Sequence, residues 1–255
     1  GGGRGGPRPP ACDTCTVVRD VAAEKARMAV WLAHELRTPL NCVLGYAELL
    51  CDQLEAPEAA PLLADALRVR DLALHQIALL EDVLDLARLE HGGLRLELGP
   101  VEAIGVLKQV AEAALPRVRR GGNRILLLAD GEAWTLADET RLRQVLLNLV
   151  GNAAKFTRDG LVTLGAGRAN GSVCLHVSDT GSGMTPEEAD RVFLPFQQAN
   201  AAVAAMHGGT GLGLSISREL CERMGGSVRL TTSPGEGTTF TVTLPAAPRP
   251  EASAS

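Results

Sequence analysis

The sequence predicts an α plus α/β protein: a helical hairpin that forms a dimeric four-helix bundle, followed by an α/β sandwich whose mixed sheet is covered by helices on one face. Two stretches, about 16–54 and 61–90, repeat apolar residues at helical spacing. Between them, "EAPEAAP" at 55–61 holds two prolines, which is typical of a turn. From about residue 94 onward, short apolar runs alternate with helical patterns, as α/β domains require.

Changes in composition divide the chain into four segments. Residues 1–15 are rich in Gly, Pro and Arg at their start and are expected to be a disordered linker. The helical hairpin is assigned to 16–92, the α/β domain to 93–245, and a disordered tail or linker to 246–255. "CDTC" at 12–15 has the spacing of half a zinc site or a redox pair, but no second pair of ligands accompanies it, so plain thiols stay open as the alternative.

The overall charge and hydropathy exclude some partners. The net charge is −5, which argues against nucleic acid and anionic membranes, because both favour a basic surface. No apolar run approaches the about 20 residues of a membrane helix, so no membrane contact is expected within this segment. We expect a cytoplasmic segment. The chain does not begin with Met, and any sensor or membrane anchor would lie upstream.

The first helix carries a heptad seam with one interruption. Its positions are Val18, Val21, Lys25, Met28 and Leu32, then Leu36, Pro39, Val43, Tyr46 and Leu50. The step of four residues from Leu32 to Leu36 is a stutter. His34 lies roughly 200° around the helix from Leu32 and is therefore expected to face solvent, beside Glu35. A histidine next to a carboxylate that can take its proton is a candidate nucleophile.

The second helix is also amphipathic. Its buried side is expected to contain Leu63, Leu67, Leu74, Ile77, Leu80 and Leu84, with Ala66, Ala73, Val83 and Ala87. Two such helices bury little surface by themselves, so we expect a homodimer in which two hairpins form the bundle.

The α/β part has eight elements that can be assigned from periodicity and turn residues. The expected strands are Ile125–Ala129, Leu161–Gly165, Val173–Val177, Ser227–Thr232 and Thr238–Leu244, and the expected helices are Ala103–Leu115, Glu139–Lys155 and Gly213–Met224. The most continuous apolar run, "ILLLA" at 125–129, is expected to be a buried strand.

Four stretches of this part contain residues suited to a ligand site. "NLVGNAAKF" puts Asn148 and Asn152 on one helix face, where two amides could hold hydrated Mg²⁺ or could merely be solvated. "DTGSGM" follows a strand, and Asp179 there could accept a hydrogen bond from an exocyclic amine. Gly181 and Gly183 would let the backbone turn tightly against a ligand, although this could be an ordinary turn.

The other two stretches are "RVFLPFQQ" at 191–198 and "GGTGLGLS" at 208–215. The glycine-rich stretch leads into a helix, and its backbone amides would make an anion site. It lacks the lysine and spacing of the P-loop. Between the two stretches lie small residues that suit a mobile lid.

Taken together, in this order and behind "HELRTPLN", these motifs closely resemble the transmitter core of sensor histidine kinases of two-component systems, over roughly residues 20–245. The resemblance implies that His34 is the phosphoacceptor, that Glu35 accepts a proton from its ring, and that Thr38 orients water for phosphatase action. It implies ATP and Mg²⁺ as cofactors, a homodimer, and a response regulator receiver domain as partner, in trans or fused downstream.

The resemblance also assigns the nucleotide site. The implied contacts are Asn148, Asn152, Lys155, Phe156, Asp179, Gly181, Gly183, Met184, Phe193, Phe196, Gly209, Thr210, Gly211, Leu212 and Gly213. Asn148 and Asn152 would form the Mg²⁺ side, Lys155 would reach phosphate, Phe156 would pack on the purine, and Asp179 would read adenine.

The resemblance implies an ATP-dependent autokinase that phosphorylates His34 and passes the phosphoryl group to an Asp of the receiver domain. Related ATPases of this fold have a Glu where this chain has Asn148, and an amide cannot act as a base at neutral pH. A plain ATPase is therefore not expected. Many relatives have Arg or Lys where this chain has Ala205, Met206 and His207. The alternative is thus a catalytically weak, nucleotide-binding dimeric signalling scaffold.

Overall fold

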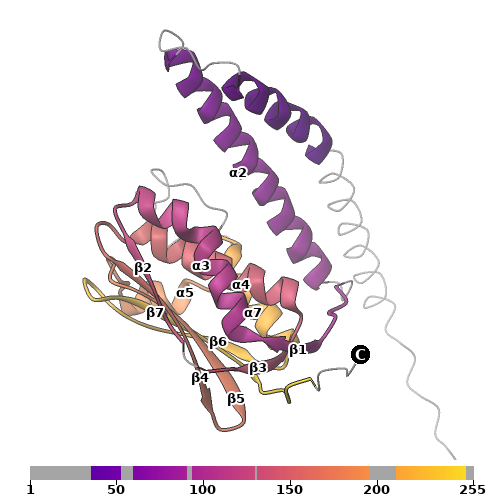
Figure 1. Cartoon of the computed structure of the whole chain (residues 1–255), viewed down its shortest axis with the longest axis vertical. Coiled ribbons are helices and arrows are strands. Elements are labelled where there is room, and N and C mark those ends of the chain that lie inside the picture. Colours follow the sequence, from indigo (N-terminus) through magenta and orange to yellow (C-terminus); the bar gives the residue numbers. More distant parts are fainter. Residues whose placement is uncertain (1–35, 53–59, 91–93, 130, 196–210, 251–255) are drawn as a thin grey trace, which may run out of the picture. The chain divides into compact units, whose positions relative to one another are not determined.

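The computed structural model describes residues 36–52, 60–90, 94–129, 131–195 and 211–250. Its contacts divide the chain into two compact units, residues 1–94 and residues 95–255 (Figure 1). Among the described residues the four cysteines are free thiols, whereas the "CDTC" stretch lies outside them.

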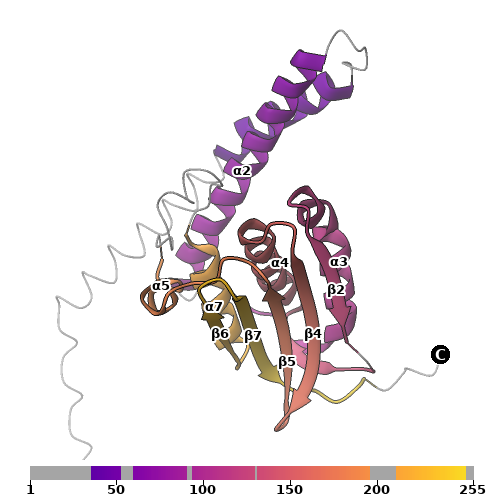
Figure 2. The same ribbon diagram turned by 90° about the vertical axis from the view of Figure 1, so that its left-hand side faces the viewer.

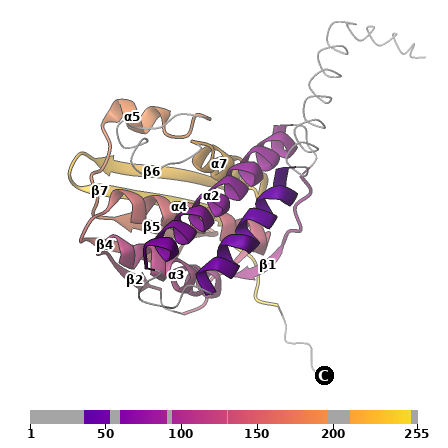
Figure 3. The same cartoon turned by 90° about the horizontal axis from the view of Figure 1, so that it is seen from above.

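The first unit is a hairpin of two helices, residues 36–52 and α2 (Ala60–Glu90), which lie side by side (Figures 1 and 3). Arg37 Nη2 lies 3.5 Å from Glu81 Oε1 and joins the two helices. Several of its buried side chains are small, including Ala47, Ala66 and Ala73. Small side chains let two helix backbones approach closely, so the hairpin packs along an alanine stripe.

The heptad seam of the first helix does not pack within the single chain. Leu36, Pro39, Val43, Tyr46 and Leu50 are all exposed there. On α2, Leu74 and Val83 are exposed at 47% and 40%, although the sequence placed them on the buried side. The apolar pattern of the sequence did not distinguish residues that pack between the two helices of one hairpin from residues that stay exposed on it.

The second unit is a two-layer α/β sandwich. Its main sheet has the order β2 (Arg124–Leu128), β4 (Leu161–Ala169), β5 (Ser172–Asp179), β7 (Gly237–Pro245) and β6 (Ser227–Ser233). The β2–β4 pair is parallel and the other pairs are antiparallel, which confirms the mixed sheet. Three helices, α3 (Ala103–Arg120), α4 (Glu139–Phe156) and α7 (Gly213–Arg223), cover one face (Figure 2).

Two local predictions were wrong. The run at 125–129 is part of an edge strand, and Leu126 and Leu128 on its outer face are 43% and 59% exposed. The first helix of the α/β unit does not end at Leu115 but continues through Pro116, because the buried stripe of Ala114 extends to Val118. The proline lies on the exposed side, where its ring and missing N–H cost least.

A second sheet of two short strands, β1 (Gly99–Glu102) and β3 (Trp134–Ala137), was not predicted, and neither was α5 (Pro186–Arg191). On its other side β3 contacts the segment that follows β7, since Thr135 forms a bridge with Ala246. Ala247 N donates to Trp134 O at 2.9 Å, and Ala247 is 8% exposed. Residues 246 and 247 are therefore packed against the α/β unit.

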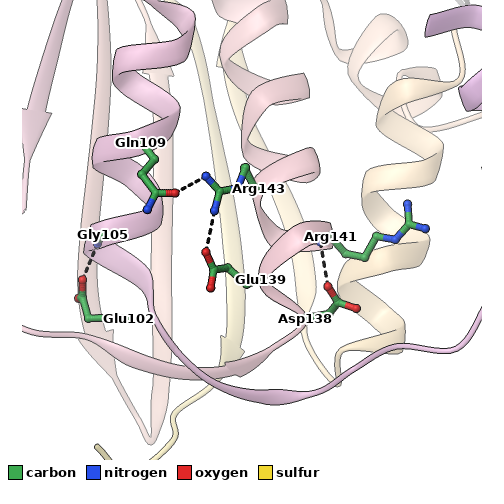
Figure 4. A network of polar contacts seen from close by, with 7 residues as sticks. All are labelled: Glu102, Gly105, Gln109, Asp138, Glu139, Arg141 and Arg143. Carbon is green, nitrogen blue, oxygen red and sulfur yellow. Dashed lines mark hydrogen bonds and ion pairs between the residues drawn. The ribbon is translucent and has the colours of Figure 1, made fainter. Parts of the chain in front are cut away.

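Acidic side chains cap the N-terminal ends of α3 and α4 (Figure 4). Glu102 accepts hydrogen bonds from the Ile104 and Gly105 amides and so starts α3. Asp138 accepts from Arg141 N and from Glu97 N, which starts α4. These caps fix the N-terminal ends of two neighbouring helices, and α4 leads from there into the candidate site.

Candidate functional site

The helix α4 has two distinct faces: one packs into the core, and the other carries polar residues. Leu142, Val145, Leu146 and Leu149 are 0% exposed. Asn148, Asn152 and Lys155 lie on a different stripe and are half-buried. The spacing of four residues places the two amides one turn apart, as the sequence predicted.

Asn148 connects α4 to α7. Its Nδ2 donates to Ser217 Oγ at 2.9 Å, and Ser217 is only 2% exposed. A Cβ added to Gly213 would collide with the Asn148 amide group. Glycine at 213 therefore lets the first turn of α7 lie directly on Asn148, and this brings the helix of "NLVGNAAKF" against the helix that follows "GGTGLGL".

Asp179 ends β5 and is 7% exposed. Burial raises the pKa of its carboxyl group, while hydrogen bonds from the backbone of Gly181 and Thr238 act in the opposite direction. Gly181 N donates to Asp179 Oδ1 at 2.9 Å. The Thr157 side chain also lies close to the carboxyl group and lowers its pKa. Its Oγ1 is buried, and among the described residues it has no partner at hydrogen-bonding distance and angle.

The glycines of "DTGSGM" make room for the protein's own backbone. A Cβ at Gly181 would collide with the Phe156 carbonyl oxygen, and a Cβ at Gly183 would collide with that of Ser233. Gly183 also has φ +62°, which favours glycine. Ser182 N donates to Phe156 O at 3.3 Å. The loop is thus held against the end of α4. This close packing explains the two glycines, and the sequence alone did not reveal it.

Lys155 and Phe156 end α4 beside this loop. Lys155 Nζ lies 5.1 Å from the centroid of the Phe156 ring. Burial, and then the nearby Arg117 guanidinium, lower the pKa of Lys155. Phe156 is 36% exposed, so part of its ring remains open to a flat ligand.

Phe193 lies in the core of the unit. It is 7% exposed, meets Phe240 edge-on with 6.2 Å between ring centroids, and has Arg218 Cζ 4.1 Å above its ring. Its contact with nucleotide remains a prediction. Met184 is half-buried, and its backbone N donates to Thr232 Oγ1 at 3.0 Å.

The remaining predicted residues divide into two groups. Thr38 is exposed on helix 36–52, Leu212 is 1% exposed, and Gly211 has φ +68°. Five predicted site residues lie outside the described part of the chain: His34, Glu35, Phe196, Gly209 and Thr210.

Sequence reasoning missed Thr157, Ser217 and Thr238, which line or brace the site. Thr157 directly follows "NLVGNAAKF", and Ser217 lies one helical turn after Gly213, so their spacing to the motifs was an available signal.

The α/β unit thus gathers a buried carboxylate, a partly open aromatic ring, a lysine and two amides around the C-terminal half of α4. These groups suit the parts of a nucleotide: an exocyclic amine, a base, and a metal-bound polyphosphate.

Comparison with known proteins assigns both units to the domains that the sequence resemblance implied. Residues 24–92 match the family model of the His Kinase A (phospho-acceptor) domain. Residues 137–248 match that of the histidine kinase-, DNA gyrase B- and HSP90-like ATPases. In the described part of the chain, no helix is both long enough and apolar enough to span a membrane.

Similar full-length proteins are much longer than this chain. It is 35% identical over 232 residues to the autoinducer 2 sensor kinase/phosphatase LuxQ of Vibrio parahaemolyticus, covering 88% of this chain and 27% of LuxQ. It is 35% identical to the histidine protein kinase DivJ of Caulobacter vibrioides, covering 88% and 38% of the two chains. The crystal structure of full-length ShkA in complex with AMPPNP is 39% identical, with a TM-score of 0.71 over 87% of this chain and 46% of ShkA. The two family matches and these relatives show that the chain belongs to the sensor histidine kinases and comprises their transmitter core.

Proposed function

We propose that this chain is an ATP-dependent protein histidine autokinase that phosphorylates His34 and passes the phosphoryl group to an Asp of a response regulator receiver domain. The observation that carries the proposal is the contact of Asn148 with Gly213 and Ser217, which joins two motifs separated by about 60 residues of sequence. The complex of the similar ShkA with AMPPNP supports ATP as the phosphoryl donor.

In the proposed site Asp179 accepts a hydrogen bond from the adenine amine. Its carboxylate is already oriented by Gly181 N. Phe156 contributes the exposed part of its ring to the base, and Lys155 turns its ammonium group to the phosphates. A half-buried ammonium group interacts more strongly with phosphate than one surrounded by water.

We assign Mg²⁺ to the amide oxygens of Asn148 and Asn152. Mg²⁺ keeps several waters and takes few protein oxygens, so two amides suffice beside the phosphates. The hydrogen bond from Asn148 Nδ2 to Ser217 fixes the orientation of that amide. Among the described residues none hydrogen-bonds to the Asn152 side chain, which leaves its oxygen available to the ion.

The transfer itself needs a nucleophile rather than an activated water. A ring nitrogen of His34 attacks the γ-phosphorus, the bond to the leaving ADP oxygen breaks, and Glu35 accepts the proton from the other ring nitrogen. The neutral amide of Asn148 cannot deprotonate water, so the phosphoryl group is kept for His34. Thr38 lies four residues after His34 in the sequence and is exposed, and in phosphatase action it would orient the water that hydrolyses the phosphorylated Asp of the receiver domain.

The hairpin supports a homodimer. In the single chain, Tyr46 of the heptad seam is 70% exposed, and Leu62 and Leu72 of α2 are each 63% exposed. Such an apolar surface on two helices is best buried by a second hairpin, which gives a four-helix bundle.

Incubation of the full chain with Mg²⁺ and γ-labelled ATP tests the proposal. Label should appear on protein, be lost in acid and survive alkali, and be absent from His34→Gln, which should still bind ATP. His176→Gln is the matched control, because His176 lies in the sheet, bonded to Thr241 Oγ1, and should leave labelling unchanged. Undiminished label in His34→Gln would refute the assignment. Tight ATP binding without label, even with a receiver domain present, would instead support the scaffold alternative.

A further inference from the structure

Arg117 places a guanidinium group against α4, in a position that none of the sequence motifs explains. It belongs to the last turn of α3. A Cβ built on Gly151 of α4 would lie 3.0 Å from Arg117 Nη1, 3.4 Å from Cζ and 3.8 Å from Nη2. These three guanidinium atoms therefore lie over Gly151, in the space that a side chain at that position would need.

Gly151 is buried and borders the polar stripe of α4. It follows Asn148 by three residues and precedes Lys155 by four, so both are its neighbours on the helix surface. With about 100° per residue, Gly151 and Lys155 lie roughly 40° apart around the axis. The guanidinium group of Arg117 thus lies next to the side of α4 that carries Lys155.

The two cations stand together without a carboxylate for Arg117. Among the residues that the structure describes, none forms an ion pair or a hydrogen bond with the Arg117 side chain. Burial, and then Arg120, lower the pKa of Arg117, and Arg117 in turn contributes to the lowered pKa of Lys155. Like charges held close and partly desolvated repel each other, and an anion bound between them relieves that repulsion.

We propose that Arg117 is a second cationic contact for the polyphosphate of ATP, beside Lys155. The inference rests on the proposed nucleotide site and adds a residue from α3 to it. A guanidinium group suits this task because it is always charged and can donate two parallel hydrogen bonds to phosphate oxygens. Its flat contact with Gly151 fixes the plane in which those donors point.

Calorimetric titration of the full chain with Mg-ATP and, separately, with AMP tests the proposal. Arg117→Gln should weaken ATP binding by about fivefold to tenfold, as expected for a partly exposed charge pair, and weaken AMP binding by less than about twofold. Arg117→Lys keeps the charge but loses the paired donors, so it should recover only part of the ATP affinity. Arg120→Gln removes a neighbouring exposed charge and should leave both affinities unchanged.

Gly151→Ala provides a second test that does not depend on the folding of the arginine variants. Alanine favours the helix, so the melting temperature should equal or exceed that of the wild type. The new methyl group would displace the guanidinium group by a few tenths of an ångström and should lower ATP affinity by about twofold to fivefold. A rise in stability together with a loss of ATP affinity is not expected from a purely structural contact.

Two results would overturn the inference while leaving the nucleotide site intact: wild-type ATP affinity in Arg117→Gln, or equal losses for ATP and AMP. If the wild-type chain bound no nucleotide, the proposed function itself would fail.

Discussion

The two units of this chain differ in the exposure of their large apolar side chains. In the hairpin, large side chains such as Tyr46 and Leu62 are 70% and 63% exposed, and several of the buried positions are alanines. In the α/β unit, Leu142, Leu146 and Leu149 of a single helix are all 0% exposed. The α/β unit therefore completes its core within one chain, whereas the hairpin leaves apolar surface for a partner.

The cause of the difference is geometric. Two helices share one line of contact and can enclose only a narrow stripe of each. A sheet covered by three helices encloses a continuous layer between them. The comparison predicts that a substitution in one unit affects either folding or association, but not both.

The largest effect is expected from Leu149→Ala. Removing a buried leucine in a two-layer core should lower the free energy of unfolding of the α/β unit by about 3 kcal/mol. Denaturant unfolding measures the loss, and sedimentation velocity should show unchanged self-association. A simultaneous loss of association would mean that the two units do not behave independently.

Leu50→Glu should affect association and leave folding of the α/β unit unchanged. Leu50 is 50% exposed on the heptad seam, and a charge there should cost about 2 kcal/mol for each chain in the dimer. Sedimentation equilibrium gives the dissociation constant. Leu128→Glu, on the outer face of β2 and 59% exposed, is the matched control and should not change the oligomeric state. Equal effects of the two would show that exposure alone, rather than the seam, determines association.

Asp179→Asn should increase stability and decrease nucleotide affinity. Because burial raises the carboxyl pKa in the folded state, the wild type loses stability as pH rises through that pKa, and the neutral amide avoids this loss. At pH 7 the variant should be the more stable of the two, with the difference vanishing in acid, below the unfolded-state pKa.

The same variant should bind ATP about tenfold more weakly, because a carboxylate is the stronger acceptor. Thermal unfolding across pH, together with calorimetry, measures both changes. The exposed Asp190→Asn should alter neither. Lower stability of Asp179→Asn at neutral pH would contradict the role assigned to burial.

The smallest effect is expected from Glu81→Gln. Its ion pair with Arg37 is long and partly exposed, so the loss should not exceed about 0.5 kcal/mol. It should also disappear in high salt. A loss of several kcal/mol would show that this ion pair, rather than the alanine stripe, holds the two helices together.

Much of the architecture could be predicted because its signals are local. The helix around Asn148 and the strand that ends at Asp179 each show a clear period, and the sheet is mixed as expected. The strands β1 and β3 have only four residues each, and β1 contains Gly and Pro, so they lack a readable period. The edge position of β2 was missed because an apolar run looks the same in a central strand as at an edge.

The sequence motifs identified the residues of the candidate site, but they did not show which contacts between the motifs hold these residues in place. The collision of a Cβ at Gly181 with the Phe156 carbonyl, and the bond from Asn148 to Ser217, join segments that are far apart in sequence. No pattern within either segment encodes such a pairing. The contact of Arg117 with Gly151 was missed for the same reason.

The short strand β3 has a consequence for engineering. It pairs with β1 at Val101 and, on its other side, bridges to Ala246, so Thr135 lies between the entry and the exit of the α/β unit. Two strand spacings separate these points, about 10 Å. A linker of a few residues could join them. The chain could be reopened at the exposed turn of Pro234, Gly235 and Glu236, at the loss of the hydrogen bond from Gly235 N to Ser182 O. The α/β unit should therefore tolerate circular permutation.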